Sequence, residues 1–133
     1  MPFTDADEVV HYIGGIFETA FATEGIGDKL AATGVVLLVR STDPDSAFVV
    51  DTANRRVLAG DDGAQPSATM TMSADTQNAY WQGKVNLPVA MARGQIKVSG
   101  QVGQLLKLAP LSKPLFAGYV ERLKADGRDD LVL

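Results

Sequence analysis

The chain contains no cysteine and a single histidine, His11. The missing cysteine excludes disulfides, thiolate metal sites and cysteine nucleophiles. One histidine without cysteine cannot build a typical zinc or copper site, so we expect neither a metal nor another cofactor. The lack of cysteine is also compatible with a reducing compartment, and we expect a cytoplasmic protein.

Long apolar runs and clusters of basic residues are lacking as well. No stretch approaches the roughly 18 apolar residues of a membrane span, and the start, MPFTDADEVV, shows no signal peptide. The net charge is −4 and no Lys/Arg cluster is present. This pattern argues against a nucleic-acid partner and leaves at most transient membrane contact. The sequence does not decide whether the protein forms a homodimer.

The length of 133 residues predicts one domain, 1–133, with a core large enough to be stable without covalent cross-links. Apolar spacing predicts helices over 5–22 with Thr4 as N-cap, over 74–82, from Leu87, over 101–109 and over 112–124, the last two separated by Pro110. The last helix is expected to bury its apolar stripe against a sheet. Alternation and turn residues predict strands over 35–40, 47–51, 55–59, 67–73 and 95–99. The expected fold is α+β: an antiparallel sheet of about five strands covered by N- and C-terminal helices.

Motifs for catalysis are weak or missing. His11 falls on the polar side of the first predicted helix, which indicates a solvent-exposed residue. No nucleophile-elbow sequence supplies a serine partner for it. The carboxylate pairs Asp61-Asp62 and Asp129-Asp130 stand in a loop and in the tail, where solvated surface is the simpler interpretation. These observations predict that the protein is not an enzyme.

Three short motifs with two glycines each permit either a ligand-binding or a purely structural interpretation. Gly25-Ile26-Gly27 lacks a third glycine and does not follow a strand, so a nucleotide loop is not expected. Gly100-Gln101-Val102-Gly103 joins a strand to a helix and would suit an anion, but no lysine follows as in a phosphate-binding loop. Gly14-Gly15, inside the first helix, favours either close packing against a sheet or an opening near a ligand.

Methionines and the only tryptophan gather in the middle of the chain, at Met70, Met72, Trp81 and Met91. Methionine adapts its shape and often lines surfaces that accept varied ligands, although composition alone favours plain core filling. By helical spacing Trp81 shares a face with Gln77. We therefore expect its ring to border a pocket and its emission to shift to the blue when a ligand enters.

A succession of short motifs runs from Pro66 to Leu108. It comprises an alternating strand ending in Ser (Met70 to Ser73), Gly83-Lys84, Asn86, Gly94, the strand Ile96-Lys97-Val98, and Gly100 with Gly103 before a Leu/Lys-rich helix. No single motif is specific, but their order and spacing together resemble the sterol carrier protein type 2 family.

This resemblance implies an apolar tunnel between the sheet and the helices, and binding and carriage of a lipid: a fatty acid, acyl-CoA, sterol or isoprenoid. Two alternatives remain: a scaffold or oligomerisation module with a closed pocket, and an accessory subunit that presents lipid substrates to separate enzymes. The residues expected to bind the ligand are Phe17, Phe21, Met70, Met72, Gln77, Trp81, Met91, Ile96, Leu105, Leu108, Phe116 and Tyr119.

Two features, at three positions, depart from the family pattern. Gln77 and Asn78 stand where relatives usually carry apolar residues, and Gln95 stands where lysine often follows the second glycine. Two amides facing a pocket would suit a ligand with a polar head, because buried amides need partners. The alternative is that they face solvent.

Overall fold

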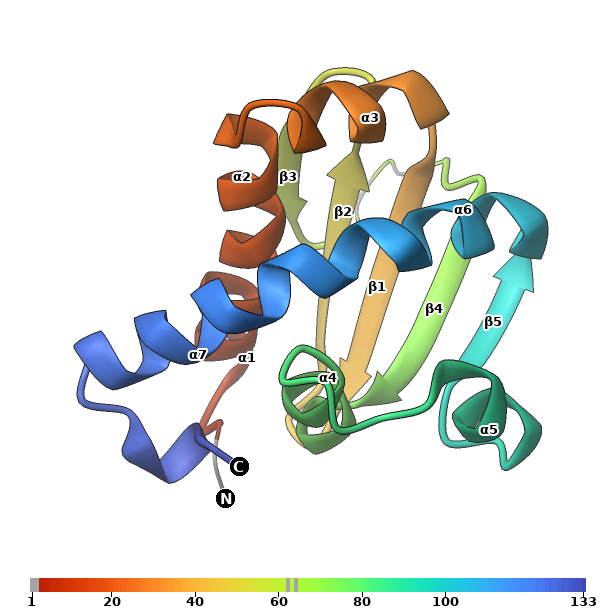
Figure 1. The fold of residues 1–133 in the computed structure, drawn as a ribbon. Coiled ribbons are helices and arrows are strands. Elements are labelled where there is room, and N and C mark those ends of the chain that lie inside the picture. Colours follow the sequence, from red (N-terminus) through yellow and green to blue (C-terminus); the bar gives the residue numbers. More distant parts are fainter. Residues whose placement is uncertain (1–2, 62, 64) are drawn as a thin grey trace.

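The computed structural model describes residues 3–61, 63 and 65–133. At its centre lies a five-stranded sheet with the spatial order β3-β2-β1-β4-β5 (Figure 1). The strands are β1 (Val36–Thr42), β2 (Ser46–Asp51), β3 (Arg56–Ala59), β4 (Ala68–Ser73) and β5 (Lys97–Gly100). Every predicted strand is present, and together with the helices they confirm the α+β fold class.

One pairing departs from the antiparallel expectation, because β4 runs parallel to β1. Strands β1 and β3 are both antiparallel to β2 and so point the same way. In the connection between β3 and β4, Gly60 bonds to Ala47 beside the C-terminal half of β1, whereas Ser67 bonds to Val36 at the start of β1, where β4 begins. Asp61, in this connection, forms an ion pair of 2.9 Å with Arg40, whereas its sequence neighbour Asp62 lies outside the described residues. Parallel strands are usually joined by a helix. The short polar connection between β3 and β4 contains no predicted helix, so the sequence did not indicate that β4 would be parallel to β1.

The predicted N-terminal helix is present as α1 (Ala6–Val9), a π-helical turn (Val10–Gly14) and α2 (Gly15–Ala22). Its N-cap is Asp5 and not Thr4: the Asp5 carboxylate accepts a hydrogen bond of 2.9 Å from the Glu8 N–H. Thr4 donates its hydroxyl to the Glu8 carboxylate instead, at 2.6 Å. Both residue types cap helices well, so composition alone did not decide where the first turn starts.

Helix α3 (Ile26–Thr33) is an addition to the sequence-based expectation. Its buried residues are Gly27 and Leu30, which is too short an apolar stripe to recognise by period. Gly34 ends the helix with a left-handed backbone, φ +64°, a conformation that glycine adopts without steric cost.

The second half of the chain forms α4 (Ala74–Tyr80), α5 (Leu87–Ala92), α6 (Val102–Ser112), α7 (Phe116–Ala125) and the 3-10 turns Lys113–Leu115 and Asp129–Leu131. The predicted break at Pro110 is wrong, because α6 continues through it to Ser112. Pro110 is exposed, so its ring and missing N–H fall on the solvent side. Leu108 and Ser112, on either side of it in the sequence, are buried and keep this part of the helix packed against the rest of the protein.

Helix α6 crosses the sheet in front of β1 and β4, whereas α7 lies beside the N-terminal helix and extends past the sheet edge (Figure 1). Tyr119 of α7 contacts α4, and Arg122 contacts the N-terminal helix. The expectation that the last helix packs its stripe on the sheet is therefore corrected: these residues pack on other helices, because the chain turns away from the sheet between α6 and α7.

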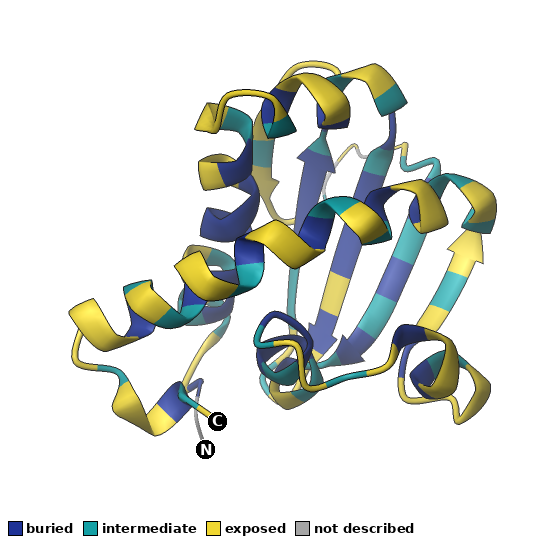
Figure 2. Cartoon of the chain, in the orientation of Figure 1, coloured by how far each residue is buried: buried dark blue, intermediate teal, exposed yellow. Residues whose placement is uncertain are grey.

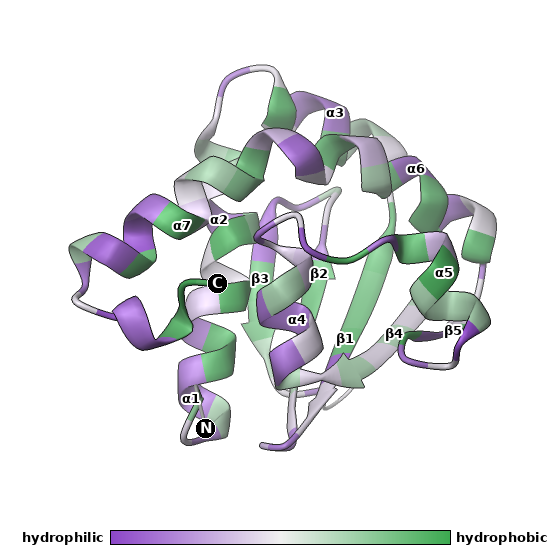
Figure 3. Ribbon diagram, turned by 60° about the horizontal axis from the view of Figure 1, so that its bottom comes forward, coloured by the Kyte–Doolittle hydropathy of each residue, from purple (hydrophilic) through white to green (hydrophobic). Residues whose placement is uncertain are grey.

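The core forms where the helices meet one face of the sheet. Leu37 and Val39 of β1, Phe48 and Val50 of β2 and Met70 of β4 alternate onto this face and are buried. Figure 2 shows buried residues concentrated along the central strands, and Figure 3 shows the same strands as the most hydrophobic part of the sheet. The space between this face and α6 contains the candidate site.

Candidate functional site

A small cavity of about 40 Å³ lies between the inner face of the sheet and helices α2, α4 and α6. The strands contribute Leu37, Val39 and Met70 to its wall. The remaining lining residues come from the helical parts of the chain: Phe17, Leu30, Gln77, Tyr80, Trp81, Leu87, Leu105, Leu108, Ala109, Leu111, Ser112 and Leu115. A cavity of this size has room for about three water molecules.

Half of the residues expected to bind the ligand line this cavity: Phe17, Met70, Gln77, Trp81, Leu105 and Leu108. The rest lie elsewhere, with Met72 and Ile96 buried in the core, Phe21 and Met91 half-buried beside it, Phe116 behind the ring of Trp81, and Tyr119 in a separate groove described below. The structure thus brings together some of the expected residues of α2, β4, α4 and α6, and leaves out Phe21 of α2, Met72 of β4 and the expected residues of the outer elements.

Several lining residues escaped the sequence analysis. Leu37 and Val39 alternate on β1, and Val39 lies directly opposite Met70 in the parallel register. The sequence is apolar throughout residues 35–39, so it did not show which side chains face the core, and an expected antiparallel sheet gave no pairing between these two strands. Tyr80 precedes Trp81 in the chain, and its place on the wall depends on how α4 packs.

Aromatic rings form one side of the cavity. The Trp81 side chain is 5% exposed. Its ring centroid lies 5.3 Å from Phe17 and 5.2 Å from Tyr80, both edge-on, and 6.2 Å from Phe116. Such edge-to-face pairs favour a fixed arrangement of the rings, so this side of the cavity is stiffer than the methionine and leucine side.

The polar groups of the cavity are paired with one another. Gln77, 1% exposed, donates its amide to the Ser41 hydroxyl at 3.3 Å. The Tyr80 hydroxyl lies 2.9 Å from Ser112 Oγ, and the Ser112 hydroxyl donates to the Ala109 carbonyl at 2.6 Å. Burial raises the pKa of the Tyr80 phenol, and the Ser112 contact offsets part of that rise. The cavity therefore presents a neutral and largely apolar surface.

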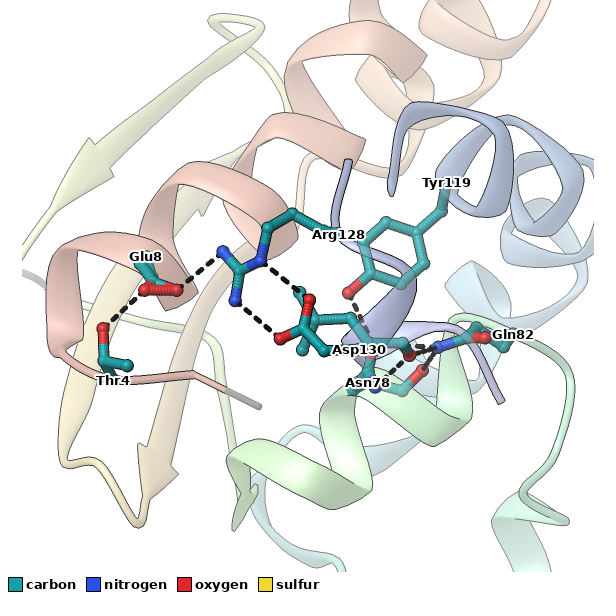
Figure 4. A network of polar contacts seen from close by, with 8 residues as sticks. Thr4, Glu8, Asn78, Gln82, Tyr119, Arg128 and Asp130 are labelled. Atoms are coloured by element: carbon teal, nitrogen blue, oxygen red, sulfur yellow. Dashed lines mark hydrogen bonds and ion pairs between the residues drawn. The ribbon is translucent and has the colours of Figure 1, made fainter. Parts of the chain in front are cut away.

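Asn78, the second unexpected amide, points away from the cavity into a buried polar cluster (Figure 4). Its Oδ1 accepts hydrogen bonds from the Tyr119 hydroxyl at 2.7 Å and from the Gln82 amide at 2.9 Å. Its own amide donates to the Leu131 carbonyl at 2.8 Å. Neither Gln77 nor Asn78 faces solvent: the first belongs to the cavity wall, and the second ties α4 to α7 and to the end of the chain.

Arg128 continues this connection to the N-terminal helix (Figure 4). Its guanidinium pairs with Glu8 at 2.8 Å and with Asp130 at 3.1 Å. Hydrogen bonds from Thr4 and from Arg128 hold the pKa of Glu8 below its usual value, and Arg128 does the same for the pKa of Asp130. The bonds to Asp130 and Glu8 in turn raise the pKa of Arg128. Asp130 of the predicted tail pair is thus part of an ion-pair network.

A second, larger hollow of about 360 Å³ lies between α2 and α7. Ile16, Thr19, Thr23, Ile26, Pro114, Gly118 and Tyr119 line it, with Gly15 and Arg122 at the α2–α7 contact and Leu115 also lining the inner cavity. A Cβ on Gly15 would overlap the Arg122 guanidinium, whereas a Cβ on Gly14 would meet Val57 of the sheet at 3.4 Å. Of the predicted alternatives for this glycine pair, Gly14 therefore fits sheet packing, and Gly15 leaves room at the groove.

The remaining glycine motif has a structural explanation. Gly100 has a φ of +83°, and a Cβ there would come within 2.6 Å of the Ser67 carbonyl. The strand end thus requires glycine for backbone reasons. Within the described residues, no group of three or more His, Asp or Glu side chains is placed to hold a metal ion, and no helix among them has the length and apolar character to cross a membrane.

Solved structures with the same arrangement of elements come from sterol carrier proteins. Sterol carrier protein domain 2 of Helicoverpa armigera matches with a TM-score of 0.67 and 22% identity over 83% of this chain and 89% of that one. The apo sterol carrier protein 2 of Yarrowia lipolytica matches with a TM-score of 0.66 and 15% identity over 84% and 94%. Sterol carrier protein 2 of Aedes aegypti, in complex with the C16 fatty acid palmitate, matches with a TM-score of 0.57 and 25% identity over 84% and 96%.

A search of curated proteins found no match. The model of the SCP-2 sterol transfer family matches residues 17–113, which include the whole sheet, the cavity wall from Phe17 to Ser112 and the motif stretch from Pro66 to Leu108. The expected resemblance is thereby confirmed, and the chain belongs to the SCP-2 sterol transfer family.

Proposed function

We propose that this protein binds a single-chain lipid in the space between the sheet and α6 and carries it without chemical change. The observation that carries the proposal is the wall of the inner cavity, whose polar groups, such as Gln77 and Tyr80, are already paired with Ser41 and Ser112. An apolar chain can occupy such a space without breaking these hydrogen bonds. The palmitate bound by the Aedes aegypti relative supports the same ligand class.

The energetics suit a carrier. Burial of a sixteen-carbon chain contributes ~13 kcal/mol at ~0.8 kcal/mol per methylene. Association costs of roughly 4–15 kcal/mol offset much of this. Micromolar affinity, about −8 kcal/mol, falls within the resulting range and would permit both binding and release.

The absence of chemistry is also part of the proposal. His11 is exposed and its Nε2 lies 3.2 Å from an Arg122 nitrogen, so it is neither near the cavity wall nor paired with a serine. Neutral, self-paired hydroxyl and amide groups in the cavity provide no general base. The lack of cysteine remains in keeping with a cytoplasmic setting.

A second candidate, a module of the same fold with a closed pocket, is favoured by one observation. The inner cavity measures about 40 Å³, whereas pockets for small molecules run to about 300–1,000 Å³. A lipid therefore enters only if side chains such as Leu115 and Met70 move. Unbranched methionine does this at low cost, and the adjoining groove of about 360 Å³ supplies further space.

Native mass spectrometry on gently purified protein, followed by titration with palmitate, separates the two candidates. Ala109→Phe places a ring in the cavity from a half-buried position, while Ala117→Phe makes the same change at an exposed position of α7. We expect palmitate to bind the parent and Ala117→Phe, and to bind Ala109→Phe at least tenfold more weakly. Equal binding by both variants, or no binding by the parent, would remove the cavity as the site and favour the closed module.

A further inference from the structure

The groove between α2 and α7 contains Arg122, whose guanidinium forms no ion pair with any carboxylate of the described residues. The guanidinium carbons of Arg122 and Arg128 lie 5.8 and 5.5 Å from the centroid of the Tyr12 ring. Arg128 is paired with two carboxylates. Among the described residues Arg122 has no ion pair within 4.0 Å, and its polar contact is a ring nitrogen of His11 at 3.2 Å. A histidine ring carries no negative charge, so Arg122 keeps its own charge available.

The rest of the groove is suited to an apolar chain. Half of the residues that line it are large and mainly apolar: Ile16, Ile26, Pro114, Leu115 and Tyr119. The Thr23 hydroxyl is already bonded to the Thr19 carbonyl at 2.7 Å. One cation in a groove whose wall is largely apolar is complementary to an anionic amphiphile.

We propose that the Arg122 guanidinium, in the α2–α7 groove, binds the carboxylate of a long-chain fatty acid whose hydrocarbon tail passes Leu115 into the inner cavity. The proposal rests on the lipid-carrying function proposed above and adds the place and charge of the head group. A planar guanidinium matches one carboxylate with two parallel hydrogen bonds. A coenzyme A thioester carries several phosphate charges, which one arginine in a chain of net charge −4 does not balance.

The direction of the ligand follows from the two spaces. Leu115 lines both the groove and the cavity and is itself buried, so it forms the wall between them. The polar groups of the cavity are neutral and paired internally, and an unpaired carboxylate there would be strongly disfavoured. The head group therefore stays with Arg122, and the tail takes the apolar end.

Two glycines keep the groove open. Gly15 leaves the space that the Arg122 guanidinium occupies across α2. Gly118 lines the groove, and a Cβ added there would meet no atom within 4 Å. A larger side chain at Gly118 would thus fill the groove while improving the helix propensity of α7.

Calorimetric titration with palmitate and with hexadecanol tests the charge. Arg122→Gln removes it, and Arg93→Gln is the control, because Arg93 is exposed at the end of α5 and remote from both spaces. We expect Arg122→Gln to weaken palmitate binding about ten- to hundredfold and to leave hexadecanol binding within twofold. Arg93→Gln should change neither. Equal loss of both ligands in Arg122→Gln, or an unchanged affinity for palmitate, would overturn the head-group site.

A steric pair tests the groove independently of charge. Gly118→Leu fills it, and Gly103→Leu makes the same change in α6, where a Cβ also meets nothing within 4 Å. Palmitate binding should fall at least tenfold in Gly118→Leu only, with a melting temperature no lower than that of the parent. Unchanged palmitate binding in Gly118→Leu overturns the groove as the head-group site.

The parent protein separates this inference from the function on which it rests. Palmitoyl-CoA should bind the parent more weakly than palmitate, and tighter binding would overturn the single-carboxylate assignment. If the parent binds neither palmitate nor hexadecanol, the carrier function itself is wrong. If it binds both and Arg122→Gln loses neither, the function stands and only the head-group site is wrong.

Discussion

The Tyr119 hydroxyl of α7 donates a 2.7 Å hydrogen bond to the Asn78 carboxamide oxygen of α4, and both side chains are almost fully buried. Burial, with a smaller contribution from Tyr12, raises the pKa of the Tyr119 phenol, so it remains a donor throughout the neutral range. Through Asn78 this contact also reaches the Leu131 carbonyl. The contact fixes α7 beside the groove.

Removal of that hydroxyl should weaken the α4–α7 connection. We expect Tyr119→Phe to lower the free energy of unfolding by about 1 kcal/mol, because Asn78 keeps its contact with Gln82. Asn78→Ala should cost about 3 kcal/mol, since it leaves several buried groups without partners. Urea denaturation of both variants and the double variant measures this. Fully additive effects would show that the Tyr119–Asn78 bond contributes no coupling energy.

Trp81 should report the arrival of a lipid tail. Because the ring is 5% exposed, we expect its emission to lie at short wavelength without ligand, and the blue shift expected from the sequence should be small. A dibrominated stearate whose chain enters the cavity should instead quench Trp81, since bromine quenches indole only at contact. Stearate without bromine serves as the control. Saturable binding of both acids with no loss of fluorescence would place the tail away from Trp81.

The Arg128 network predicts an acid-sensitive part of the stability. Glu8 and Asp130 have lowered pKa values in the folded state, so the stabilisation is complete above their unfolded values of about 4.3 and 3.9 and is lost as pH falls through the lower folded values. We expect Arg128→Gln to lose about 1 kcal/mol at pH 7, or roughly 3–5 °C in melting temperature. The gap to the parent should narrow below pH 4 in thermal scans. A gap of constant size down to pH 2.5, with Arg93→Gln unaffected, would contradict this explanation.

Hydrogen exchange should distinguish the outer helices from the sheet. Residues 116–125 bury Tyr119 and Leu123 and expose much of their opposite side, whereas β1 and β2 are paired on both edges. Amides of α7 should therefore exchange before those of the central strands. Saturating palmitate should slow exchange in α6 and in the first turns of α7. If α7 is among the most protected segments without ligand, it does not serve as the mobile side of the site.

The sequence by itself determined the elements and their approximate places. Alternation of apolar and polar residues located the strands, for example over 68–73, and helical spacing located the N-terminal helix, because these periods follow from backbone geometry alone. The order of short motifs from Pro66 to Leu108 indicated the family, which the match over residues 17–113 confirms. Phe17, Met70 and Trp81 were expected at the ligand site from that resemblance, and they line the cavity.

Tertiary structure alone decided which of these residues meet. The parallel pairing of β1 with β4 places Val39 opposite Met70, and no local pattern encodes the path of the short connection between β3 and β4. The adjacent amides Gln77 and Asn78 point to different surroundings, because successive helical residues face about 100° apart and their partners come from β1 and from the end of the chain. Arg122 reaches the groove only because α7 turns beside α2. Contacts between segments this far apart in the sequence depend on the packing of the whole domain, and no single stretch of sequence determines that packing.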